Sequence, residues 1–201
     1  MIRVSVLCLL LSGVSALSLA AQEQTGLRVL PSDRQIAAAV LPLPAVHRPA
    51  ATVLGYDAQG RLVRLRGGSG IFTCLADDPR DDRFHVACYH NSLEPFMARG
   101  RQLRAQGVQG DAVDSTRNAD VAAGRLRMPA MAALYSLTGP GTSYDRATSA
   151  VTGAQPLFVV YVPGATEAST GISTTPRSGA PWLMEPGTPK AHIMFQPGMG
   201  R

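Results

Sequence analysis

Hydrophobic and polar positions alternate early in the chain in a way that predicts a β-hairpin. Residues 52–56 and 61–66 are the two strands, and the polar residues 57–60 form the turn between them. In the second strand the side chains at 62, 64 and 66 alternate with Val63 and Leu65. This two-residue period is expected of a strand with one buried and one solvated face.

A second hairpin is predicted directly after the first. The apolar segments 71–75 and 84–90 flank the polar loop 76–83, which has a proline at its centre. If the two strands pair about the middle of this loop, Cys74 lies opposite Cys88, because both are equidistant from residue 81.

Apolar positions at helical spacing predict three helices. Residues 32–40 form the first, with Ser32 as its N-cap. Asn91 caps the second, where Glu94 is placed to complete a capping box, and the helix ends at Gly107. Its apolar stripe consists of Leu93, Phe96, Met97 and Leu103, and its arginines, Arg99, Arg101 and Arg104, are expected to project away as a solvated face. The third helix spans 111–123 and is closed by Gly124.

The C-terminal half is mostly extended. Strands are predicted at 132–137, 157–162 and 191–195, and a loop rich in Ser, Thr, Gly and Pro precedes the last of them. The apolar run 157–162 predicts a central strand covered on both faces. The whole pattern predicts an α+β fold: a mainly antiparallel sheet with two inserted helices on one face and abundant loops.

Residues 1–20 have the three parts of a secretory signal peptide. Arg3 supplies the positive start, 4–11 is the apolar run, and small residues at Ser18 and Ala20 fit signal peptidase. Cleavage is predicted after Ala20, or one residue later. The mature chain then consists of a Pro/Ala-rich lead-in at 21–50 and a single domain at 51–201, without a membrane span. Export to the periplasm or to the medium follows, and the sequence does not choose between them.

Charge and cysteine content narrow the classes of partner. The net charge of +5 is mild and spread along the chain, and the arginines lack the aromatic interleaving of a nucleic-acid surface, so no nucleic-acid partner is expected. Only Cys74 and Cys88 remain after the signal peptide is removed. Because the destination is oxidising, a disulfide between them is expected.

Three segments are similar to a group of uncharacterised exported bacterial proteins. They are LADD at 75–78, the run FHVACYH with the following SLEPFMARGR at 84–101, and PWLMEPGTPKAHIM at 181–194. No activity is assigned to that group. The resemblance therefore implies export and a single domain, and it brings no catalytic residue with it.

Two groups of residues could bind a metal. His192 and Met194 share a strand face, and with His90 they offer the imidazole and thioether ligands that suit copper or the axial positions of haem. Cys74, His85, Cys88 and His90 also crowd together, but strand parity lets at most three of them converge, and a disulfide removes both thiolates.

Two further groups of polar residues are better explained by ordinary structural roles than by a ligand or catalytic site. The acidic loop at 77–82 lacks the spacing of an EF-hand, and Ser69 lies in a glycine-rich segment that does not match the serine-hydrolase pattern. None of these patterns assigns a catalytic residue.

The function expected from the sequence is therefore a non-catalytic exported domain without a cofactor. It would bind a partner or small ligand through its C-terminal loops, where Tyr161 and Trp182 supply an aromatic surface. The alternative is a periplasmic copper, haem or redox protein using His192 and Met194.

Overall fold

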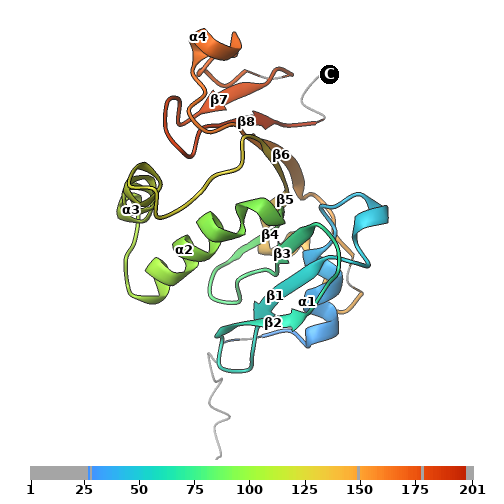
Figure 1. The fold of residues 1–201 in the computed structure, drawn as a ribbon. Coiled ribbons are helices and arrows are strands. Elements are labelled where there is room, and N and C mark those ends of the chain that lie inside the picture. Colours follow the sequence, from blue (N-terminus) through green and yellow to red (C-terminus); the bar gives the residue numbers. More distant parts are fainter. Residues whose placement is uncertain (1–26, 28, 149, 178, 198–201) are drawn as a thin grey trace, which may run out of the picture.

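Eight strands of the described residues pair side by side in one sheet, in the order β2-β1-β3-β4-β5-β6-β8-β7 (Figure 1). The computed structural model describes residues 27, 29–148, 150–177 and 179–197. The strands are β1 Thr52–Tyr56, β2 Leu62–Arg66, β3 Phe72–Leu75, β4 Arg83–His90, β5 Ala132–Pro140, β6 Gln155–Tyr161, β7 Trp182–Met184 and β8 His192–Phe195. Neighbours are antiparallel except β1 and β3. The predicted α+β class with a mainly antiparallel sheet is confirmed.

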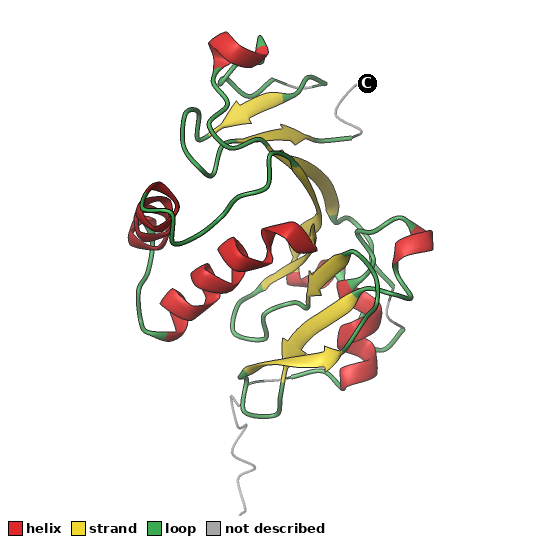
Figure 2. Ribbon diagram, viewed as in Figure 1, coloured by secondary structure: helices red, strands yellow, loops and turns green. Residues whose placement is uncertain are grey.

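Helices cover both faces of this sheet (Figure 2). They are α1 Ser32–Ala39, α2 Glu94–Ala105, α3 Asp111–Ala122 and the short α4 Glu167–Thr170, and short 3₁₀ turns occupy 45–47, 91–93 and 141–143. The inserted helices α2 and α3 lie on one face, as predicted, and α1 lies against the other (Figure 1).

The face under α1 holds the driest part of the core. Ala39 and Leu43 pack against Val53 of β1 and against the disulfide between Cys74 and Cys88, and all of these residues are buried. Burial of these apolar side chains is the main favourable term in folding. Residues of the predicted lead-in segment thus form part of the packed core.

β4 lies near the middle of the sheet. Residues 157–162 were predicted to form a central strand covered on both faces; β6 is indeed an interior strand, between β5 and β8, but the predicted coverage of both faces is wrong. Phe84, Val86 and Cys88 of β4 are fully buried, with alternate residues facing α2. In β6, Phe158 remains 38% exposed. An apolar run indicates a strand but does not say how many of its faces are covered, because that depends on where other elements pack.

The two predicted helix caps differ from those in the structure. Ser32 lies inside α1, and Pro31 holds the N-cap position without a side-chain bond. The capping box of Asn91 and Glu94 does not form, because β4 runs directly into a 3₁₀ turn that the His90 side chain caps by accepting from the backbone N–H of Ser92. Asn91 instead bonds across to the hydroxyl of Thr73.

Two C-terminal elements were missing from the predicted pattern. The loop before the last strand contains α4, held by a capping box in which Thr166 and Ser169 satisfy each other's backbone N–H groups. It also contains β7, which pairs with β8 along three residues. Elements of three or four residues are too short to show a hydrophobic period.

The predicted disulfide is confirmed. Cys74 and Cys88 are directly opposite in the register of β3 and β4, and their sulfur atoms are bonded. The predicted signal peptide, residues 1–20, lies outside the described residues. No helix in the described part of the chain is both long and apolar enough to cross a membrane.

Loss of the disulfide should lower the free energy of unfolding substantially. The cross-link joins positions 14 residues apart, and the chain-entropy treatment of such a loop gives a stabilisation of about 3 kcal/mol. We expect the double variant Cys74→Ala/Cys88→Ala to lose at least this much in urea denaturation. The unchanged protein denatured with a reductant is the control, because it loses the cross-link without losing buried atoms. Equal stability of oxidised and reduced protein would contradict the assignment.

Candidate functional site

The side chains that alternate away from the disulfide face make the floor of an open groove. Register places Leu75 of β3, Ala87 and Tyr89 of β4, Leu134 of β5 and Tyr161 of β6 on the same face of the sheet. Most of this floor is apolar, and the two tyrosines add hydroxyl groups. An apolar concave surface with a few polar groups is the usual character of a small-ligand site.

Two helices and a loop form the walls of this groove. Met97, Arg101 and Arg104 project from α2 at the spacing of one helix face, and α3 contributes Asp114 and Arg117 opposite them. The loop between β7 and β8 supplies Lys190. We call the space between floor and walls the basic groove, and its volume is about 270 Å³.

One end of the basic groove is held by a bonded cluster of Tyr89, Glu94 and Arg101. The Arg101 guanidinium donates to the Tyr89 hydroxyl at 2.8 Å and to Glu94 Oε1 at 2.5 Å, and the Tyr89 hydroxyl donates to the other carboxylate oxygen of Glu94. Burial of Tyr89, together with its bond to Glu94, raises the pKa of this phenol well above its ordinary value. Tyr89 is therefore a neutral structural group and not a base.

The other end is organised around the buried Arg117. Its guanidinium stacks 4.0 Å above the ring of Phe96 and forms an ion pair with Asp114. Lys190 Nζ bonds to the second Asp114 oxygen at 2.5 Å and lies 3.3 Å from Glu185 Oε1. Burial works against ionisation of Asp114, but the bonds from Lys190 and Arg117 prevail and lower its pKa. This chain of charges ties α3 to the C-terminal loop.

Three polar groups of the groove have no hydrogen-bond partner within the described residues. The Nε of Arg117 is fully buried and unpaired, and the hydroxyl of Tyr161 and the guanidinium of Arg104 take part in no bond that the described side chains supply. Tyr161 is only 7% exposed. The Tyr161 hydroxyl and the exposed guanidinium of Arg104 are therefore the groups free to bind a ligand, whereas Arg117 Nε has no accessible surface.

Three arginines of α2 were predicted to form a solvated helix face, and this prediction was wrong for Arg99 and Arg101, while Arg104 is exposed as expected. Arg99 pairs with Asp120 of α3, Arg101 bonds to Tyr89, and Arg104 lines the groove. The signal in the sequence was the spacing of Met97, Arg101 and Arg104, which share a helix face beside the apolar stripe. Helical periodicity alone does not show that a second helix and a sheet face will enclose that side.

Tyr161 is brought to the groove, and Trp182 is not. Trp182 packs in the sheet with 8% of its surface exposed, so it offers little contact area. The C-terminal loops do border a second hollow, but on the opposite sheet face, between Phe158, Phe195 and the segment 179–181. Among the residues that the structure describes, no charged side chain lines this hollow.

The three predicted metal ligands do not converge. His192 and Met194 lie on the face that carries Tyr161, whose ring stacks 5.3 Å from that of His192. His90 lies on the opposite face, edge-on to Phe72. Burial lowers the pKa of His192, and its Nδ1 is 2.8 Å from the carbonyl oxygen of Lys190. Among the residues that the structure describes, no group of three or more His, Cys, Asp or Glu side chains could hold a metal ion.

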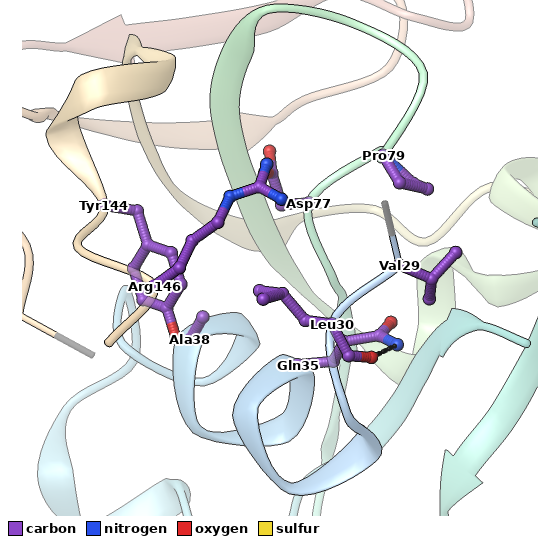
Figure 3. Close-up of a pocket in the computed structure, with 8 residues that line it drawn as sticks. All are labelled: Val29, Leu30, Gln35, Ala38, Asp77, Pro79, Tyr144 and Arg146. Atoms are coloured by element: carbon purple, nitrogen blue, oxygen red, sulfur yellow. Dashed lines mark hydrogen bonds between the residues drawn. The ribbon is translucent and has the colours of Figure 1, made fainter. Parts of the chain in front are cut away.

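A separate enclosed cavity lies beneath α1. Figure 3 shows Leu30, Gln35, Ala38 and Tyr144 around it, with the Arg146 side chain extending toward Asp77. The cavity holds about 20 Å³, the space of a single water molecule, so it is no ligand site. Burial raises the pKa of Asp77 to about 6, although the bond from the His85 N–H and the charge of Arg146 oppose this rise.

Comparison of the chain with known proteins supplies no function. No protein family matches the sequence, and neither a similar curated protein nor a similar solved structure was found. The resemblance to exported bacterial proteins stays a prediction, and the functional argument depends on the basic groove itself.

Asp77 should make the protein less stable as the pH rises. Its pKa is about 6 in the folded protein and about 4 when unfolded, so the folded state favours the protonated form. The stability contributed by Asp77 is fully present below pH 4 and is lost between about pH 4 and pH 6.

In urea denaturation across this pH range, Asp77→Asn should remove the fall in stability. Asp82→Asn, in the same loop, is the matched control for the change in charge. Parallel pH profiles of the Asp77 variant and the unchanged protein would contradict this assignment.

Proposed function

We propose that this protein is an exported, non-catalytic domain that binds a small ligand in the basic groove. The observation that carries the proposal is the presence there of two polar groups without partners, on Arg104 and Tyr161, in a groove with a mostly apolar floor. Pockets of this kind combine apolar contact area with a few polar groups that fix the orientation of the ligand.

Export is supported by the signal-peptide pattern at 1–20 and by the disulfide. Cys74 and Cys88 are fully buried and cross-linked, and such bonds persist in oxidising compartments. The binding site differs from the aromatic loop surface expected from the sequence, since its walls come mainly from α2 and α3. The C-terminal segment contributes Tyr161 and, through the loop before β8, Lys190.

Filling the basic groove should abolish ligand binding without unfolding the protein. The probe is 8-anilinonaphthalene-1-sulfonate, which combines aromatic rings with one negative charge and fluoresces when its rings leave water. Ala87→Phe places a ring on the groove floor, and we expect it to weaken binding of the probe at least tenfold. Ala112→Phe adds the same ring at an exposed position of α3 that does not line the groove.

Met97→Trp narrows the groove from its α2 wall and is the second filling variant if Ala87→Phe fails to fold. Thermal unfolding checks the fold of each variant. If the folded filling variants bind the probe as tightly as Ala112→Phe does, the groove is not the binding site.

A second candidate function is copper or haem binding at His192 and Met194. The observation in its favour is the contact of His192 Nδ1 with the backbone carbonyl of Lys190. Such a bond leaves Nε2 as the unprotonated nitrogen, the arrangement usual in metal-binding histidines. Met194 follows on the same strand face.

This candidate predicts stoichiometric copper or iron in mature protein purified from an exporting host without a metal-affinity tag. Elemental mass spectrometry should then show that His192→Ala loses the metal, while His47→Ala, at a histidine in the 3₁₀ turn 45–47, keeps it. Metal-free protein that gains no stability from added copper or haem would exclude the assignment.

A further inference from the structure

The charges of the basic groove are paired with each other except at one position. Arg101 is neutralised by Glu94, and Lys190 and Arg117 share the carboxylates of Asp114 and Glu185. Arg104 also lines the groove, and its guanidinium forms no ion pair or hydrogen bond with any described residue. The groove therefore presents about one positive charge that its own carboxylates do not balance.

The floor of the same groove supplies a neutral hydrogen-bond donor, the Tyr161 hydroxyl. Burial raises the pKa of Tyr161 to about 12, with Asp114 and Glu185 adding to the rise and Arg117 opposing it. The phenol therefore keeps its proton at neutral pH and can donate it. A carboxylate accepts well from both kinds of donor, since bonds between a charged group and a hydroxyl or guanidinium are the strong class.

The rest of the lining requires an apolar ligand body. Leu75 and Leu134 on the floor and Met97 on the α2 wall are partly buried and belong to the same hydrophobic cluster. A volume of about 270 Å³ is slightly below the range of about 300–1,000 Å³ typical of drug-sized ligands. The groove thus suits a ligand with a short hydrocarbon portion.

We infer that the ligand of the basic groove is a small monoanionic amphiphile, in which one carboxylate meets Arg104 and the Tyr161 hydroxyl and a short hydrocarbon body lies on Leu75, Leu134 and Met97. This inference rests on the proposed function, because it names the chemistry of the ligand at that site. A phosphate monoester fits less well, since its second negative charge would find no further unpaired cation among the described groove residues.

Displacement of the fluorescent sulfonate by simple probes tests this inference. Octanoate should displace it, whereas octanol, with the same chain and no charge, and acetate, with the same charge and no chain, should each bind at least tenfold more weakly. Octyl phosphate should bind no more tightly than octanoate. Arg104→Gln should weaken octanoate about tenfold or more and leave octanol unchanged, because a hydrogen bond to a charged group is worth roughly 1.5–3 kcal/mol.

Tyr161→Phe removes only the hydroxyl and should weaken octanoate about threefold to tenfold. Arg177→Gln is the matched charge control, because Arg177 is exposed in the loop before β7 and does not line the groove.

Equal affinities for octanol and octanoate, or equal effects of Arg104→Gln and Arg177→Gln, would overturn the monoanion inference. The proposed function would survive that result if Ala87→Phe still abolished binding. If Ala87→Phe has no effect on any probe, the proposed function itself fails.

Discussion

The ion pair between Arg117 and Asp114 is the interaction on which the groove depends. Arg117 is buried between the ring of Phe96 and the backbone of α2, where Gly100 leaves room for it: a Cβ at that glycine would lie 3.0 Å from the guanidinium. Desolvating a guanidinium is costly unless it is paired. Asp114 supplies the carboxylate that pairs with Arg117, and it also binds Lys190 of the C-terminal loop. The pair itself lies within α3, but Arg117 stacks on Phe96 of α2 and Asp114 binds Lys190, so it links α3 to two other walls of the groove.

The sheet serves two different purposes on its two faces. Under α1, the disulfide and the side chains of β1 and β4 form a dry core that contributes stability. On the other face, Leu93 and Met97 pack against Tyr89 and its neighbours, and an open groove remains between this cluster, α3 and the C-terminal loop. Arginines are suited to this side because their long stems cover apolar surface while their charged ends stay near solvent. The dry core and the groove thus lie on opposite faces of one sheet.

Local sequence signals predicted much of the fold because they depend on neighbours in the chain. The alternation in 71–75 and 84–90 placed Cys74 opposite Cys88, and the structure confirms that register. The left-handed glycines Gly107 and Gly124 follow α2 and α3 as expected. The capping box at Asn91 was wrong because Glu94 bonds to Tyr89 and Arg101 instead, and those partners are brought together by the turn between β4 and α2.

The candidate site was less accessible to sequence analysis than the fold. Tyr161 was singled out, but Trp182 proved to be buried and His90 lies on the opposite face from His192. The sequence by itself determined the longer strand and helix segments, the cross-strand disulfide and the α+β class, because each follows from periodicity or spacing over a few residues. Only the tertiary structure decided that Arg104, Arg117, Lys190 and Tyr161 surround one groove. They come from four separate elements, and a one-dimensional pattern contains no distance between them.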